Sequence, residues 1–142
     1  MLFRSRPALA KGEIVVSDRY NDASFAYQGY GRELGVATVR AFDRIICGRT
    51  QPDLTIVLDL APSLSLKRAQ GRESGRKSKQ ERFELQGMRF HKRVRDAYLA
   101  IARKEPRRVK LVQADGPVAE VQAEIRKLVD AFLARRLKGV GG

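Results

Sequence analysis

Short apolar runs alternate with helix-spaced apolar residues along this chain, and this alternation restricts the fold more than any other feature. Residues 13–17 (EIVVS), 55–60 (TIVLDL) and 109–112 (VKLV) are compact runs typical of buried strands. Apolar side chains recur at helical spacing over residues 32–47 and 81–102. Strands that alternate with helices form parallel sheets, because each crossover helix packs back on its sheet. The sequence therefore predicts an α/β fold with a parallel sheet.

Further helices and a tail complete this pattern. Pro62 stands at the favoured first turn of a helix running toward residue 70, and residues 117–133 place apolar side chains on one face. Residues 8–10, followed by Gly12, are typical of the last turn of a helix that leads into the first strand. We expect one domain over residues 1–134 and a disordered, basic, Gly-rich tail over residues 135–142.

The composition favours a globular protein outside the membrane. The chain has 142 residues, of which 43% are apolar, and this is enough for one domain with a core. No apolar run approaches the roughly 20 residues that cross a bilayer. Cys47 is the single cysteine and no zinc-ligand spacing occurs, so we expect no disulfide within the chain, no bound metal, and a reducing, cytoplasmic setting.

The net charge indicates an anionic partner. Lys and Arg number 29 against 16 Asp and Glu, which gives +13. Nucleic acid and nucleotide phosphates both fit, and composition does not separate them. Seven basic and two acidic residues lie between positions 67 and 82. This segment is either a flap that closes on phosphates or a solvated basic loop, and its composition favours neither.

The residues that follow the first predicted strand are rich in functional groups. Asp18 and Arg19 come directly after it, and Ser24, Tyr27 and Gln28 follow within a dozen residues. Ligands of open α/β sheets bind beyond the carboxyl ends of the strands, so this segment is a candidate binding site. A structural alternative also fits, in which Asp18 caps a helix and Arg19 is its ion-pair partner.

The motifs of this chain resemble those of the thymidylate kinase (dTMP kinase) family. Residues 17–29, SDRYNDASFAYQG, are similar to the family segment D-R-Y-x-x-S-S-x-A-Y-Q-G. The likeness continues through QPDLT at 51–55 with Asp59, RFE at 82–84, and FH-x-RV-x-x-x-Y at 90–98. Several motifs in the family's order exceed chance agreement. The resemblance implies the three-layer fold of P-loop nucleoside monophosphate kinases, with dTMP and the ATP–Mg²⁺ complex as substrates.

The resemblance implies roles for the residues after the first strand. Arg19 would hold the 5′-phosphate of dTMP through a bidentate contact, and Asp18 would orient Arg19 or the waters on Mg²⁺. Ser24 and Gln28 match positions that face thymine, since an amide suits the imide N–H and carbonyl of that base. Tyr27 matches the residue beside the sugar, where its bulk would exclude a 2′-hydroxyl.

The resemblance also implies an ATP side. The flexible basic LID would cover about residues 70–82, because phosphoryl transfer requires positive charge around the moving phosphoryl group. Ala114, Asp115 and Gly116 resemble the loop beside adenine. The LID candidates are arginines: Arg72, Arg76 and Arg82 for catalysis, and Arg68 for ATP binding.

The main departure from the family is the missing phosphate-cradling loop. No Gly-x-x-x-x-Gly-Lys-[Ser/Thr] occurs, and in the family this loop follows a first strand that would precede Met1. That strand lies between those matched by residues 13–17 and 55–60, so its loss would leave a gap of about 10 Å instead of about 4.8 Å. We expect a truncated, poorly stable chain with little or no kinase activity.

Two other functions stay open. One is a kinase of the same fold that acts on another deoxynucleotide or nucleoside; the set Ser24, Tyr27 and Gln28 favours dTMP instead. The other is a basic nucleic-acid-binding protein, suggested by the +13 charge and the Arg-rich tail. We expect no nucleic-acid partner and no membrane contact. Family members are commonly dimers, so the resemblance implies a homodimer.

Overall fold

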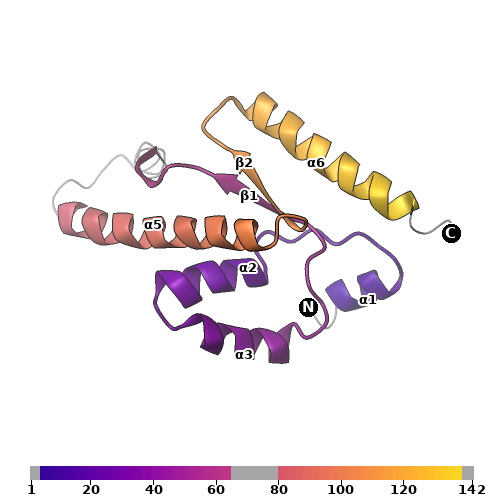
Figure 1. Ribbon diagram of the computed structural model, residues 1–142, viewed down its shortest axis with the longest axis horizontal. Helices are drawn as coiled ribbons and strands as arrows, with labels where there is room; N and C mark the ends of the chain where they lie inside the picture. The colour runs from indigo at the N-terminus through magenta and orange to yellow at the C-terminus, as the bar shows by residue number, and fades with distance from the viewer. Residues whose placement is uncertain (1–3, 65–79, 139–142) are drawn as a thin grey trace. The chain divides into compact units, whose positions relative to one another are not determined.

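The computed structural model describes residues 4–64 and 80–138, with side chains over residues 4–64 and 87–136. The chain divides into two compact units, Met1–Pro52 and Asp53–Gly142, whereas the sequence predicted one domain over residues 1–134. Figure 1 labels the elements of both units.

The second unit is built on a parallel pair of strands, as the sequence predicted. β1 (Thr55–Asp59) and β2 (Val109–Gln113) pair from Thr55 opposite Val109 to Asp59 opposite Gln113. The chain passes from β1 to β2 through α5 (Gln80–Lys104), and α6 (Val118–Lys138) follows β2. Both helices pack on β2 and lie on either side of the strands in Figure 1. The parallel α/β pattern is confirmed for this unit.

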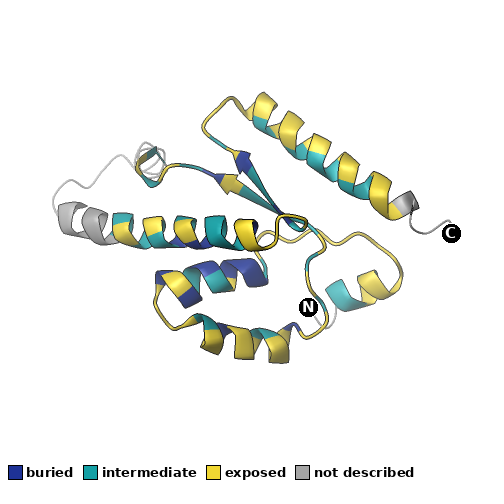
Figure 2. Ribbon diagram, viewed as in Figure 1, coloured by how far each residue is buried: buried dark blue, intermediate teal, exposed yellow. Residues whose placement is uncertain are grey.

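The core of the second unit lies between α5 and β2. Val94, Ala97 and Ala102 of α5 are buried, as are Val109 and Val112 of β2 (Figure 2). Burying such side chains stabilises the fold by about 0.8 kcal/mol per methylene group removed from water. The helix predicted over residues 81–102 is thus confirmed as α5, which runs from Gln80 to Lys104.

Two further helix predictions concern the helix that begins at Pro62 and the helix at the C-terminal end of the chain. A helix begins at Pro62, as predicted, and its continuation toward residue 70 lies outside the described residues. α6 continues to Lys138. The helix thus includes residues 135–138, which the sequence analysis placed in the tail. Residues 139–142 lie outside the described part.

The first unit is helical. α1 (Ser5–Ala10) ends before Gly12, whose φ of +77° fits the predicted helix end. α2 (Asn21–Ser24) runs directly into the π-helical segment η1 (Phe25–Gly31), and α3 (Val36–Ile46) packs on η1. Gly29 of η1 lies against α3, where a Cβ on this residue would be in ordinary van der Waals contact with Val39 at 3.6 Å. The helix predicted over residues 32–47 is thus confirmed, although it begins at Val36 rather than residue 32.

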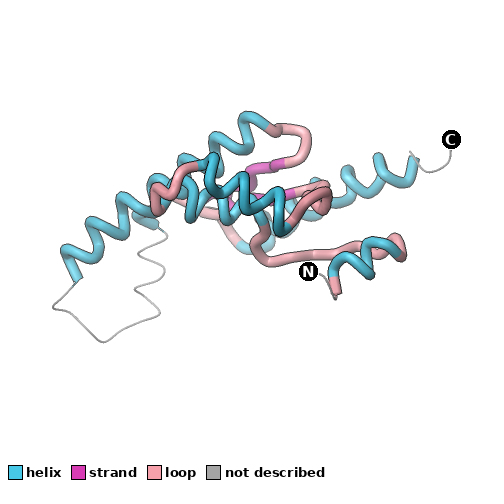
Figure 3. Tube along the Cα trace, turned by 90° about the horizontal axis from the view of Figure 1, so that it is seen from below, coloured by secondary structure: helices cyan, strands magenta, loops and turns pink. Residues whose placement is uncertain are grey.

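The strand predicted over residues 13–17 is not formed. The described residues contain only the pair β1–β2, and the stretch between α1 and α2 is drawn as loop in Figure 3. Ile14 and Val16 are 73% and 91% exposed. A strand requires a neighbour for its backbone N–H and C=O groups, and apolar content alone does not supply one. The three-layer arrangement therefore stays a prediction.

Candidate functional site

Arg19 adopts an unusual backbone conformation in the turn before α2. Its φ is +64°, in the left-handed region that residues with a Cβ rarely occupy. The Ser17 hydroxyl donates a hydrogen bond of 2.9 Å to the Arg19 carbonyl, which helps to hold this turn. Such a conformation costs about 1–2 kcal/mol, and residues of this kind cluster at functional sites. The predicted anion-binding residue is therefore held in a defined turn.

The Arg19 side chain extends over Tyr27. Its guanidinium carbon lies 4.9 Å from the centre of the Tyr27 ring, within the range of a cation–π contact. The structure thus brings together two of the residues that the sequence singled out. Asp18 precedes Arg19 in the same exposed stretch, and Ser24 is exposed at the end of α2.

Gln28 lies in η1, one residue after Tyr27. Its side-chain oxygen is buried and has no hydrogen-bond partner among the described residues. A buried acceptor without a donor costs about 1–3 kcal/mol, so this oxygen would gain from an N–H group of a ligand. The π-helical backbone is itself a feature often found at functional sites. Arg19 and Tyr27 are in contact, and Gln28 follows Tyr27 in η1; we take these three residues as the candidate site.

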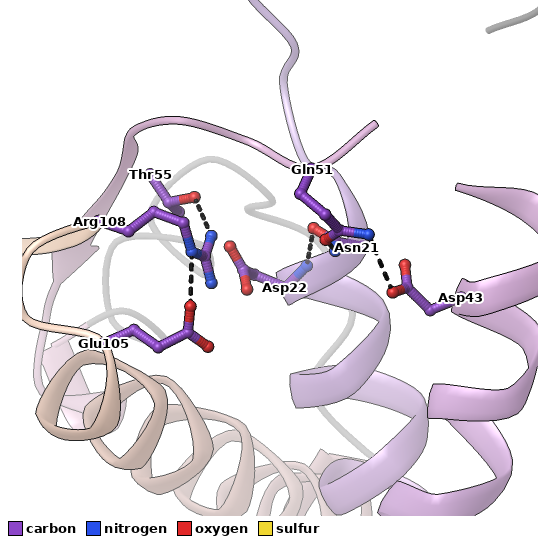
Figure 4. A network of polar contacts seen from close by, with 7 residues as sticks. All are labelled: Asn21, Asp22, Asp43, Gln51, Thr55, Glu105 and Arg108. Atoms are coloured by element: carbon purple, nitrogen blue, oxygen red, sulfur yellow. Dashed lines mark hydrogen bonds and ion pairs between the residues drawn. The ribbon is translucent and has the colours of Figure 1, made fainter. Parts of the chain in front are cut away.

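A network of hydrogen bonds at the start of α2 includes residues that the sequence analysis did not predict as functional. Asn21 and Asp22 are buried, and the Asn21 amide donates to the side-chain oxygen of Gln51. The Gln51 amide donates in turn to Asp43 (3.2 Å) and to the Gly48 carbonyl (3.1 Å). Figure 4 shows the contacts of Gln51 with Asn21 and with Asp43, which join the start of α2 to α3. Gln51 was noticed only as part of a family motif, and nothing local in the sequence marks its partners.

Tyr20 supplies a second anchor for the same turn. Its hydroxyl donates a hydrogen bond of 3.0 Å to the Thr50 carbonyl. Burial, together with a hydrogen bond to Cys47, raises the pKa of Tyr20 well above its usual value. Burial likewise raises the pKa of the Cys47 thiol. Both groups are therefore neutral at pH 7 and serve as structural contacts.

Arg6 of α1 stabilises the far end of α3. Its guanidinium donates to the carbonyls of Ile46 and Cys47, each at 3.3 Å. A cation at the last carbonyls of a helix favours the helix dipole and satisfies groups without intrahelical partners. This contact fixes the end of α3, from which Gly48, Thr50 and Gln51 follow.

Asp59 and Arg95 form a paired contact at the carboxyl end of β1. Arg95 Nε lies 2.6 Å from Asp59 Oδ1, and its terminal nitrogen lies 2.8 Å from Oδ2. Asp59 is only 5% exposed. The hydrogen bonds from Arg95 lower the pKa of the Asp59 carboxyl and outweigh the effect of burial. The charge on Asp59 is thus neutralised locally, and Arg95 was not among the predicted residues.

The predicted adenine-side loop lies at this same end of the sheet. Ala114 follows β2, and its N–H donates a 2.9 Å hydrogen bond to the Asp59 carbonyl. Asp115 and Gly116 are exposed beyond it. This is the edge at which ligands of parallel sheets bind. Figure 4 also shows Arg108 bonded to Glu105 and Thr55, a group at the opposite end of β1.

The LID prediction falls largely outside the described residues. Arg68, Arg72 and Arg76 belong to the undescribed segment, and Arg82 lies in α5 at a position where only the backbone is described. Within the described residues, no three His, Cys, Asp or Glu side chains gather in a way that could hold a metal ion. The helices of that same part include none that is long and apolar enough to cross a bilayer.

Comparison with known proteins identifies the family. The model of the family described as Thymidylate kinase matches residues 4–125. The chain belongs to the thymidylate kinase family. The match includes the Arg19 turn, η1, the Asp59–Arg95 pair and the loop after β2.

Curated relatives are similar over most of this chain. The thymidylate kinase of Symbiobacterium thermophilum is 44% identical over 136 residues, which are 96% of this chain and 61% of the relative. That of Desulfovibrio desulfuricans is 39% identical over 137 residues, 95% of this chain and 63% of the relative. That of Pseudomonas putida is 43% identical over 130 residues, 92% and 60% respectively. The chain therefore spans less than two thirds of the length of these relatives.

Proposed function

We propose that this chain provides the dTMP-binding and LID part of a thymidylate kinase, which transfers the γ-phosphate of ATP to dTMP and yields dTDP for dTTP synthesis. The observation that carries this proposal is the grouping of Arg19, Tyr27 and Gln28 in one unit. A guanidinium stacked 4.9 Å from the Tyr27 ring suits a phosphate, and a buried amide oxygen without a donor among the described residues suits a base. Family membership supports the same conclusion.

The phosphate end of the nucleotide would be held by Arg19. A guanidinium binds two phosphate oxygens at once. The contact of Arg19 with Tyr27 limits the orientations that this guanidinium adopts before the phosphate binds. Asp18 would orient Arg19 or the waters on the Mg²⁺ that arrives with ATP. In the reaction, this chain would hold the phosphate of dTMP in line with the γ-phosphoryl group that is transferred to it from ATP.

The base end would be read by Gln28 and Ser24. The Gln28 oxygen would accept the imide N–H of thymine, and its NH₂ would donate to the neighbouring carbonyl. Cytosine presents an acceptor where thymine has this N–H, so dCMP would leave the Gln28 oxygen unsatisfied. Tyr27, between the two ends in sequence, would lie beside the sugar and disfavour a 2′-hydroxyl.

The ATP side is proposed from the family resemblance. The loop of Ala114, Asp115 and Gly116 would lie beside adenine, and Mg²⁺ would enter with ATP. Because the 142 residues contain no Gly-x-x-x-x-Gly-Lys-[Ser/Thr], we propose that they bind dTMP without turning it over. We expect the enzyme to act as a cytoplasmic homodimer. The LID arginines would surround the transferred phosphoryl group: Arg68, Arg72, Arg76 and Arg82.

Calorimetric titration of the purified chain tests the proposal. We expect dTMP to bind at least about tenfold more tightly than dCMP, since one unpaired buried acceptor corresponds to such a factor. The titrations should be repeated with a short DNA duplex at two salt concentrations. Duplex binding with a steep salt dependence, and equal weak binding of both nucleotides, would instead favour a basic nucleic-acid-binding protein.

A further inference from the structure

We propose that Gln51 is a positioning residue for nucleotide binding, which acts through Asn21 on the turn that carries Arg19. The inference rests on the proposed function, because it assigns to Gln51 a role in presenting Arg19 to the phosphate of dTMP. Among the described residues, the hydrogen bonds of the Gln51 side chain reach Asn21, Asp43 and Gly48, none of which belongs to the predicted binding set. Its influence must therefore pass through the backbone of α2.

The orientation of the Gln51 side chain is determined by contacts on both sides of its amide. Its oxygen accepts the hydrogen bond from the Asn21 amide. Its nitrogen donates to the Asp43 carboxylate and the Gly48 carbonyl. Reversing the amide would set donor against donor and acceptor against acceptor, so only one orientation satisfies the site. Gln51 is thus a rigid link between α3 and Asn21.

Asn21 in turn fixes the start of α2. It is 7% exposed, and its side-chain oxygen accepts a 3.0 Å hydrogen bond from the backbone N–H of Asp22. The residue before it, Tyr20, is bonded to the carbonyl of Thr50, the residue before Gln51. Two consecutive residues after α3 therefore hold two consecutive residues after Arg19. Paired anchors of this kind set the direction of the backbone as well as its position.

Arg19 depends on such anchors because of its left-handed backbone conformation. A strained φ persists only where the surroundings determine it, and here Ser17 holds one side of the turn while Tyr20 and Asn21 hold the other. Without the Gln51 contact, the turn is free to relax toward a more common conformation. A guanidinium displaced by about 1 Å loses bidentate phosphate geometry, whereas a base-binding group farther along η1 is unaffected.

Because only the phosphate contact should be displaced, the test compares a ligand that has the phosphate with one that lacks it. The affinities of dTMP and of thymidine, which lacks the phosphate, are measured by calorimetry for wild type, Gln51→Leu and Gln51→Glu. We expect both substitutions to weaken dTMP binding about tenfold and to leave thymidine binding within about twofold of wild type, because only the phosphate contact is displaced. Gln122→Leu, an exposed substitution on α6, is the matched control and should change neither affinity.

Asp43 provides a rescue experiment. Gln51→Glu keeps an acceptor for Asn21 but sets a second carboxylate against Asp43, so the two side chains repel. Adding Asp43→Asn removes the repulsion and supplies a donor toward residue 51. We expect this double variant to recover most of the dTMP affinity lost by Gln51→Glu, and this comparison remains valid where Gln51→Leu does not fold.

The outcomes separate the inference from the proposed function. A wild-type chain that binds dTMP no better than thymidine would refute the phosphate role of Arg19, and the inference with it. A wild type that prefers dTMP, combined with variants that keep that preference, would overturn the inference alone. Equal losses for dTMP and thymidine would show that Gln51 only stabilises the unit, and would also overturn it.

Discussion

The guanidinium of Arg19 lies 4.9 Å from the centre of the Tyr27 ring, although eight positions separate the two residues in the sequence. The turn at Arg19 and the helical segment that carries Tyr27 are thereby linked by a side-chain contact. At an exposed site such a cation–π contact stabilises by about 0.5–1 kcal/mol. It orders the guanidinium before any anion binds, which reduces the entropy lost on binding.

Arg19→Lys should weaken dTMP binding by about tenfold or more, because an ammonium cannot make the two parallel contacts of a guanidinium. The melting temperature should change little, since both side chains adopt the same backbone conformation equally well. Calorimetry with dTMP and a thermal melt check both statements, with the exposed Arg40→Lys on α3 as the matched control. Unchanged dTMP affinity would rule out the phosphate role of Arg19.

Arg19→Gly should separate stability from binding. Glycine adopts the φ of +64° without the steric cost, so the free energy of unfolding should rise by about 1 kcal/mol while dTMP binding is lost. Urea unfolding followed by circular dichroism measures the first effect and calorimetry the second. A destabilised variant would show that the side-chain contact with Tyr27 outweighs the backbone strain.

Gln28→Leu should reduce the preference for dTMP over dCMP. The leucine removes the buried oxygen that has no partner among the described residues, so dCMP no longer leaves an acceptor unsatisfied. We expect dTMP affinity to fall about tenfold, and the ratio of the two affinities to approach one. Competition titrations with the two nucleotides give the ratio directly. A preserved ratio would mean that another residue recognises the base.

Asp59→Asn should destabilise the second unit and alter its pH dependence. Removing one member of the Asp59–Arg95 pair should cost about 2 kcal/mol, less than for a fully buried pair because the Arg95 side chain is 37% exposed. The pKa of Asp59 is lowered in the folded state. Its contribution is therefore complete above the unfolded pKa of about 3.9, and is lost as the pH falls through the lower folded value.

Urea unfolding between pH 7 and pH 2.5 tests this linkage. The wild-type free energy of unfolding should decrease toward the acid end of the range, and the Asp59→Asn variant should show a smaller decrease. Asp130→Asn, an exposed carboxylate substitution on α6 of the same unit, serves as the control. Parallel pH profiles for wild type and Asp59→Asn would contradict the assigned cause.

Kinase turnover should require a phosphate-binding loop that these 142 residues do not contain. We expect no dTDP from the purified chain with ATP, Mg²⁺ and dTMP. Joined behind the preceding segment of the Symbiobacterium thermophilum thymidylate kinase, a relative 44% identical to it, the chain should produce dTDP. A coupled ADP assay measures both. Turnover by the isolated chain would refute the expectation.

The sequence correctly predicted the helices and strands whose apolar side chains are spaced for packing within their own unit. β1, β2, α5 and α6 all follow from the spacing of apolar residues, because that spacing records which side of each element faces the core. Residues 13–17 had the same apolar signal, but a strand also depends on a partner that composition does not reveal. The start of α3 was misplaced because the π-helical turns of η1 extend to Gly31 and Gly35 begins a new segment.

The candidate site was predicted from motif likeness, whereas its supporting contacts were not. Arg19, Tyr27 and Gln28 stand within one family segment, so a single match identified them together. The contact of Asn21 with Gln51 spans 30 positions, and that of Asp59 with Arg95 spans 36. Pairings this distant arise from the folded backbone and leave no periodic trace in a single sequence.

The exposure of Ile14 and Val16 has a practical consequence for anyone who purifies this chain. Three β-prone residues, Ile14, Val15 and Val16, have no strand partners in the described structure and can pair with the same three in another copy, and stacked pairs of this kind aggregate. Concentrated samples should therefore turn cloudy with time. A lysine in place of Val16 would keep them clear, because like charges repel along such a stack.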